Sequence, residues 1–484
     1  MTANDSESEF ENPTESAAEA SVEPNRSASA APEAGPVLRW VERKRWWIFA
    51  AIVLWWIFGF NGQWRVGADS VFHATVARNL IEGKGFTHGP FHPVNVQPGL
   101  PYLIAGGYLL TDTETIWPAI AAVFAMGLGV LVVVFHWAKL AFGRPVAVVV
   151  TAMVGMNSLL MEFSYSVLTD VPFLLGFMLL LLGLERLRTS HGRTALSVGF
   201  LAAGVVVMGL FRSAVIVVVA AAAVGAVGWA LKKQNRPHLK WVLGCLGGGA
   251  VGLLVVRLAD PHQHGLLHPD EAQALRTLAS NLPHQLPVAL PQNILIFVQE
   301  ALPSASVGMQ LGAVAGWATF CVIFVPHAVV LVRRRPLWAL LYAAVSVPFL
   351  LFFIAPRHLL PLTPILAAGW WMLGAEARRR WPRAGLGILA CLLVIWFSLN
   401  FLRGGDLILY QRQKPFAEKY KDGRPAVLMD LGRTLRDKTE SDAVLIMLRP
   451  GVEAVAFTAR RDGISDQRLR AHPAEMKKQI GDRP

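Results

Sequence analysis

Long apolar runs recur along the chain, separated by short polar segments, which is typical of membrane-spanning helices. A span needs about 20 apolar residues, with about 17 as the lower limit. A run at 99–110 is too short and contains Pro101 and several glycines. Eleven other runs approach or reach that length: 46–60, 116–136, 145–162, 170–184, 194–211, 213–231, 241–258, 307–332, 337–355, 358–374 and 384–402. This pattern predicts an α-helical polytopic membrane protein with about eleven transmembrane helices.

The distribution of basic residues supports this count. If the N-terminus is cytoplasmic and 99–110 does not cross, alternate short loops hold twenty Lys and Arg residues, and the opposite, longer loops hold seven. Cytoplasmic loops of membrane proteins carry such an excess. A crossing at 99–110 would move every later basic cluster outside. We therefore expect a multi-pass protein of the cytoplasmic (inner) membrane, with its N-terminus in the cytoplasm and its C-terminus outside.

The polar segments divide the chain into three parts. The first, rich in Ser, Ala, Glu and Pro, cannot bury enough apolar surface to offset its ordering entropy, so we predict disorder there. In the last part, 442–448 and 452–458 have the pattern of buried strands and 467–478 that of a helix, which predicts a small α/β domain. The parts are a disordered acidic cytoplasmic tail at 1–36, a membrane domain at 37–402 with outer loops 61–115 and 259–306, and an extracytoplasmic domain at 403–484.

Composition excludes several other classes. Of 484 residues, 54% are hydrophobic and 16% charged, and the mean hydropathy is +0.44, so disordered, collagen-like and disulfide-scaffold proteins are excluded. The three cysteines, Cys245, Cys321 and Cys391, all lie inside apolar runs, which leaves no disulfide framework or cysteine metal site. The net charge of +12 could indicate nucleic-acid binding, but the basic residues mark loops on one side of the membrane instead. We expect no nucleic-acid partner.

The first outer loop contains the most informative residues. Val71, Phe72, Val76, Leu80 and Ile81 repeat at helical spacing, which predicts an amphipathic helix over 69–82 at the membrane interface. Asp69 stands at its start. This carboxylate could be a helix N-cap, or it could be held at the membrane surface beside a lipid-borne substrate. Composition alone leaves both interpretations open.

Further fragments follow in a characteristic order. Ala77-Arg78-Asn79-Leu80 is followed by Gly83 and Gly85, and then by a Pro-rich segment at 98–103. Later fragments are Tyr165 to Asp170 before a span, Leu210-Phe211-Arg212 with Ser213 where Pro is common, Pro356-Arg357-His358 with Pro361 and Pro364, and Phe457 to Arg460. Over roughly 40–375, the set resembles the GT-C superfamily of polyprenyl-phosphate-sugar-dependent glycosyltransferases, which includes protein O-mannosyltransferases and the aminoarabinose transferases of lipid A. His358 replaces the family's usual Tyr.

The predicted topology independently places Asp69, Asp170, Arg212 and Arg357 at the outer face. Carboxylates in or at the membrane are costly and are functional candidates by default. The resemblance implies that Asp69 is the catalytic base and that Asp170 is a second acid, which orients the acceptor or binds metal. Asp170 could equally cap the span that it opens.

Cations are needed to hold a donor phosphate as negative charge develops on it. Arg357 and Arg212 are candidates for such a clamp, although both could instead be snorkelling interfacial residues. Lys84, on a glycine-flanked turn, is a third candidate or a solvated loop lysine. His73 and His358 could tune the carboxylates.

No cofactor is certain. His262, His264 and His268 with Asp260 or Asp270 could hold a divalent cation, but they match no established ligand spacing.

The resemblance implies an inverting membrane glycosyltransferase of the cell envelope. It would transfer a hexosyl or pentosyl group from a polyprenyl-phosphate donor to a lipid, glycan or protein acceptor. A multi-pass transporter or lipid flippase is the alternative. Such proteins carry internal repeats and charged residues at mid-membrane depth, whereas the ionisable residues here lie at span ends. A membrane scaffold whose terminal domain is the working part is a third possibility, but it leaves the first outer loop unexplained.

Overall fold

A computed structural model provides the fold. It describes residues 35–62, 64, 68–87, 96–112, 115–189, 194–230, 290–298, 313–351 and 356–413, the strand residues 444–447 and 462–465, and scattered positions at 243–287 and 431–439. The predicted span 241–258 and outer loop 259–306 lie largely outside this description, and the predicted tail 1–36 lies almost wholly outside it.

The described chain is mainly helical. Its elements, in order, are α1 (Pro36–Arg43), α2 (Arg45–Gly59), α3 (Ala68–Ile81), α4 (Gly99–Thr111), α5 (Trp117–Phe142), α6 (Arg144–Gly155), α7 (Ser158–Ser164), α8 (Asp170–Thr189), α9 (Thr194–Phe211), α10 (Val215–Ala230), α13 (Ala313–Thr319), the π-helix η3 (Phe320–Phe324), α14 (Val325–Arg334), α15 (Pro336–Leu351), the 3₁₀-helix η4 (Pro356–Leu362), α16 (Thr363–Arg380), α17 (Pro382–Gln413), β1 (Val444–Met447) and β2 (Asp462–Ser465).

The apolar runs of the sequence coincide with helices wherever the structure describes them. By length and composition, three helical stretches could cross a membrane, namely Trp117–Phe142, Val314–Arg334 and Pro382–Leu409. The pair α6 and α7, bent by 60°, makes a fourth candidate, and α2, α9, α10 and α15 contain shorter apolar segments. A multi-helix membrane fold is therefore confirmed, and the number of eleven spans stays a prediction.

Three predicted spans are not continuous α-helices in the described residues, and one of them, the run 307–332, contains the π-helix η3 between α13 and α14. The run 145–162 breaks between α6 and α7, where the side chain of Asn157 caps α7. Backbone groups freed in an apolar surrounding must find internal partners. The Trp396 indole donates to the carbonyl of Met153 at 2.9 Å, and the Asn400 amide oxygen accepts from the Ser158 N–H at 3.0 Å. The run 358–374 likewise begins in η4 and becomes α-helical only at α16.

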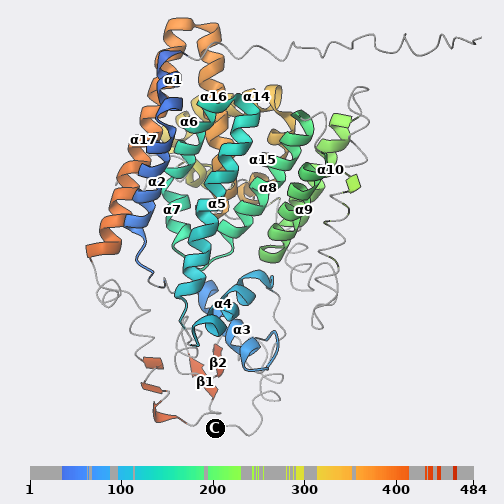
Figure 1. The fold of residues 1–484 in the computed structure, drawn as a ribbon, viewed down its shortest axis with the longest axis vertical. Helices are drawn as coiled ribbons and strands as arrows, with labels where there is room; N and C mark the ends of the chain where they lie inside the picture. Colours follow the sequence, from blue (N-terminus) through green and yellow to red (C-terminus); the bar gives the residue numbers. More distant parts are fainter. Residues whose placement is uncertain are drawn as a thin grey trace, which may run out of the picture.

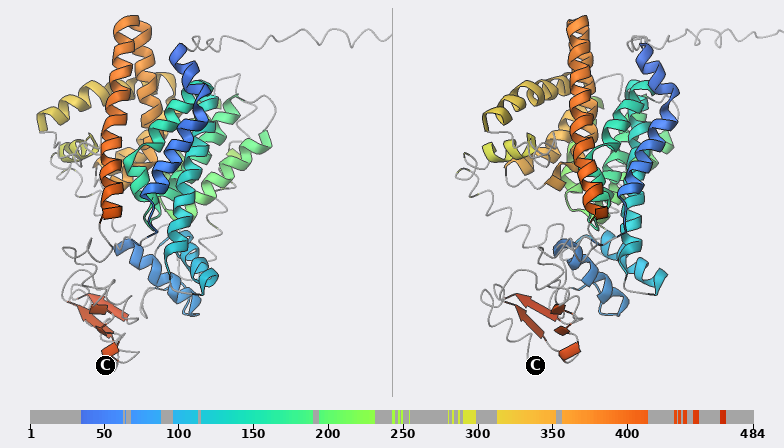
Figure 2. Two further views of the ribbon diagram at one scale, coloured as in Figure 1. Left: turned by 60° about the vertical axis from the view of Figure 1, so that its left-hand side comes forward. Right: turned by 90° about the vertical axis from the view of Figure 1, so that its left-hand side faces the viewer.

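The two ends of the bundle differ. Helices α3 and α4 pack on each other at one end, opposite the turn between α16 and α17 (Figures 1 and 2). The run 99–110 forms α4 within this end layer, and that it does not cross the membrane stays a prediction. The helix predicted over 69–82 is α3, within one residue at each end.

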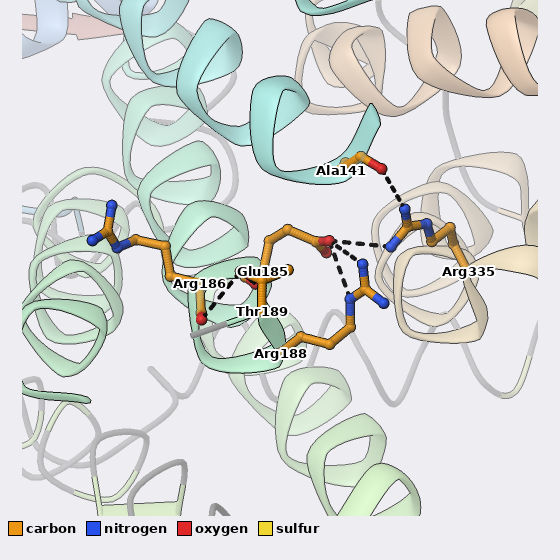
Figure 3. A network of polar contacts seen from close by, with 6 residues as sticks. All are labelled: Ala141, Glu185, Arg186, Arg188, Thr189 and Arg335. Carbon is orange, nitrogen blue, oxygen red and sulfur yellow. Dashed lines mark hydrogen bonds and ion pairs between the residues drawn. The ribbon is translucent and has the colours of Figure 1, made fainter. Parts of the chain in front are cut away.

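At the other end, a polar network around a buried carboxylate links α8, the end of α5 and the junction between α14 and α15 (Figure 3). Glu185 of α8 is 3% exposed and bonds Arg188 on its own helix and Arg335, before α15, at 3.1 Å. Arg335 also donates to the Ala141 carbonyl at the end of α5. Arg188 and Arg335, two of the basic residues predicted to lie in cytoplasmic loops, therefore also stabilise contacts within the helix bundle.

In the terminal segment, β1 lies inside the predicted strand 442–448 and pairs in parallel with β2. The predicted strand 452–458 and helix 467–478 lie outside the described residues. Helix α17 continues to Gln413, past the domain boundary predicted at 402. The small α/β domain stays a prediction.

Candidate functional site

Two carboxylates and two guanidinium groups meet in two ion pairs. Asp69 in the first turn of α3 accepts a hydrogen bond from Arg357 of η4. Asp170, the first residue of α8, accepts one from Arg212, which follows α9, at 2.5 Å. Asp170 also interacts electrostatically with Arg357 and Asp69, so the pairs form one cluster. Four residues from four separate sequence segments are thus brought together.

The packing of α8 on α9 explains why Asp170 meets Arg212. The helices touch through glycines, where a Cβ on Gly176 would lie 2.7 Å from the Met208 nitrogen and one on Gly204 would lie 2.6 Å from the Leu180 nitrogen. Small residues permit such close backbone approach between membrane helices. The contact brings the beginning of α8 beside the end of α9, and the two charges meet there.

Arg357 is positioned by a different element, the 3₁₀-helix η4. It lies in η4, which contacts α7, α8, α15 and α16. Pro364 follows at the start of α16, a position that favours proline because its missing N–H would be unpaired in any case. The 3₁₀ segment directs Arg357 towards Asp69. The Asp69 carboxylate therefore has a cationic partner from a distant helix, which an N-cap interpretation does not require.

The pairs differ in exposure. The side chain of Asp170 is 2% exposed and that of Arg212 is 23% exposed. The side chain of Asp69 is 52% exposed and that of Arg357 is 32% exposed. One ion pair is thus internal, and the other is open to solvent.

His73 lies one turn after Asp69 on α3 and is buried. Burial lowers the pKa of His73 to about 4, against the opposing effect of the Asp69 charge. Its Nδ1 has no hydrogen-bond partner among the described residues. His73 is therefore neutral at pH 7. His358 is partly buried and follows Arg357 directly in η4.

We expect the pKa of His73 to make the protein less stable in acid. The unfolded state binds a proton near pH 6.5 and the folded state only near pH 4, so the free energy of unfolding falls as the pH drops between these values. The loss approaches about 3 kcal/mol below pH 4. Thermal unfolding in detergent from pH 7 to pH 4 should show a shallower decline for His73→Phe than for the wild type; equal declines would contradict this.

Lys84 is not part of the charge cluster in the described contacts. It lies in the turn after α3 between Gly83 and Gly85, both with positive φ, and its ammonium is 2.8 Å from Glu82. The Asn79 amide donates to the Thr87 carbonyl at 2.8 Å and closes this turn. A phosphate contact from Lys84 stays a prediction, and its side chain is 64% exposed.

The histidine-rich segment with His262, His264 and His268 lies outside the described residues. Within the described part of the chain, no group of three His, Cys, Asp or Glu residues could hold a metal ion. A divalent cation stays untested.

The pairings themselves were not predicted from the sequence. Arg212 and Arg357 were expected to form one clamp, and the structure joins each to a different carboxylate. A further ion pair that the sequence did not indicate joins α17 to α7, where the Arg403 guanidinium is 3.4 Å from Glu162. The signal that could have indicated pairing is the equal number of acids and arginines among the outer-face candidates.

Comparison with known proteins gives one match to a family model. Residues 92–259 match the family model described as dolichyl-phosphate-mannose-protein mannosyltransferase. None of the curated proteins compared with the chain matches it.

Several solved structures have the same fold. ArnT from Cupriavidus metallidurans bound to undecaprenyl phosphate is 15% identical with a TM-score of 0.56, over 88% of each chain. The oligosaccharyltransferase AglB from Archaeoglobus fulgidus, in complex with an inhibitory peptide and a dolichol-phosphate, is 12% identical with a TM-score of 0.53, over 87% of this chain and 64% of AglB. The family model and the shared fold together confirm the resemblance of this chain to the GT-C superfamily of membrane glycosyltransferases.

Proposed function

We propose that the protein is a membrane glycosyltransferase that moves a sugar from a polyprenyl-phosphate donor to an acceptor at the extracytoplasmic face. The observation that carries this proposal is the cluster of Asp69, Asp170, Arg212 and Arg357 at the end of the bundle that α3 and α4 cover. The family model and the fold of ArnT support the same activity.

The cluster supplies the groups that this transfer needs. Asp69 accepts the proton of an acceptor hydroxyl, whose oxygen forms a bond to the anomeric carbon of the donor sugar. The bond from that carbon to the phosphate oxygen breaks, and its electron pair leaves with the polyprenyl phosphate. Attack from the face opposite the phosphate inverts the anomeric configuration. Arg357 stabilises the charge that develops on the phosphate, because guanidinium binds phosphate with paired, charge-assisted hydrogen bonds.

Partners and placement follow from the same proposal. The lipid carriers bound to ArnT and AglB support a polyprenyl-phosphate donor. We propose that the transferred group is a hexosyl or pentosyl group. The acceptor is a lipid, a glycan or a protein. We further propose eleven spans in the cytoplasmic membrane, with the N-terminus inside and the C-terminus outside.

The test is transfer by the purified protein in vesicles of bacterial phospholipid. Undecaprenyl-phosphate donors carrying radiolabelled hexoses or pentoses are supplied with a membrane-extracted acceptor pool, and labelled product and released undecaprenyl phosphate are measured together. We expect both to appear in equal amounts with at least one donor. Movement of the donor across the bilayer without cleavage would instead establish the lipid flippase.

A further inference from the structure

The two ion pairs of the cluster differ in how easily the arginine can leave its carboxylate for another partner. Removing the partner of a buried charge is strongly unfavourable, because the remaining charge has lost its water. An exposed ion pair contributes little, since water replaces either partner. The Asp170 carboxylate is 2% exposed and that of Asp69 is 52% exposed. Arg212 is therefore committed to Asp170, whereas Arg357 can leave Asp69.

Arg357 also retains an unused hydrogen-bond donor. Its Nε–H is buried and has no partner among the described residues, while its terminal Nη1 nitrogen bonds Asp69. A buried donor without an acceptor is unfavourable, so an incoming acceptor is favoured at this edge of the guanidinium. A phosphate carries several oxygens, so it can engage the guanidinium more fully than the one bond from Asp69 and compete with that carboxylate for the exposed pair.

We propose that the donor phosphate replaces Asp69 on Arg357, so that the base becomes free only when the donor is bound. This inference rests on the proposed function and deepens it. In the empty site, the guanidinium bonds Oδ2 of the Asp69 carboxylate, so that oxygen is not available to an acceptor hydroxyl. The bound phosphate replaces Asp69 as the hydrogen-bond acceptor of the Arg357 guanidinium. The released carboxylate remains at its exposed position, where an acceptor can reach it.

The exchange gives different roles to Arg357 and Arg212, which the sequence predicted to bind the donor phosphate together. Arg357 is the arginine that binds the donor phosphate, and Arg212 is a positioning residue that keeps Asp170 in place. Donor binding must then precede acceptor activation. A site built in this way also avoids activating water before the donor arrives.

The experiment is a double-mutant cycle on binding of undecaprenyl phosphate, measured with purified protein in detergent. Asp69→Asn removes the competing carboxylate and keeps the shape of the side chain. It should bind undecaprenyl phosphate about 3- to 10-fold more tightly than the wild type. In the Arg357→Gln background, the same Asp69→Asn change should leave the affinity unaltered, because the exchange partner is absent.

Two results would overturn the exchange. Unchanged or weaker binding by Asp69→Asn would show that Asp69 does not compete for Arg357. An equal gain in both backgrounds would show simple repulsion between the carboxylate and the phosphate. Either result leaves the proposed function standing if the wild type transfers sugar. A wild type that neither transfers sugar nor binds undecaprenyl phosphate would end both proposals.

Discussion

Asp69→Asn should lower kcat for sugar transfer by about 10²- to 10⁴-fold, the usual contribution of a general base. The amide has nearly the same size and still accepts a hydrogen bond from Arg357, but it cannot accept the acceptor's proton. Because the Asp69–Arg357 pair is exposed, the change should cost little stability. The measurement is initial transfer rates in the vesicle assay, with thermal unfolding in detergent to show that the variant is folded.

Asp112→Asn is a matched control for this substitution. Asp112 lies in the same predicted outer loop, is exposed at the end of α4 and has a positive φ of 48°, which Asn tolerates. It should transfer sugar at the wild-type rate. Retention of full activity by Asp69→Asn would remove Asp69 from the catalytic role. An equal loss in Asp112→Asn would indicate a general effect of charge in this loop.

Arg212→Gln should destabilise the protein by about 3 kcal/mol, because it leaves the Asp170 carboxylate buried without its cation. Arg357→Gln, which breaks the exposed pair, should cost about 1 kcal/mol or less. Thermal unfolding of the two variants in the same detergent tests this difference. Both substitutions remove one guanidinium, so a general effect of lost charge would affect both equally.

The double variant Asp170→Asn with Arg212→Gln completes this test. It replaces both charges by amides, so no uncompensated charge remains, and most of the stability lost in Arg212→Gln should return. Equal destabilisation by Arg212→Gln and Arg357→Gln would show that the two pairs are energetically alike. In that case, the division of roles between the two arginines would be wrong.

Much of the helical framework was predictable because its signals are local. Apolar length predicts where helices form: α2 and α9 coincide with their runs to within one residue, and α5 and α17 begin within two residues of theirs but extend further. The helix over 69–82 and the position of Asp170 at the beginning of α8 follow from patterns only a few residues long. The break between α6 and α7 was not predicted, since its stabilisation comes from Trp396 and Asn400, which are more than 240 residues away in sequence.

The sequence by itself determined the membrane class, the regions that become helices and the four charged residues of the candidate site. Hydrophobicity and charge at the ends of the spans depend only on residue type and position along the chain, so both can be read directly from the sequence. Only the tertiary structure decided which arginine pairs with which carboxylate, and which pair is buried. Those choices depend on the glycine-mediated approach of α8 to α9 and on the 3₁₀ segment that carries Arg357. The Asp170–Arg212 pair is permanent and the Asp69–Arg357 pair is exchangeable because the first is buried and the second is exposed. Burial of a side chain cannot be read from the sequence alone.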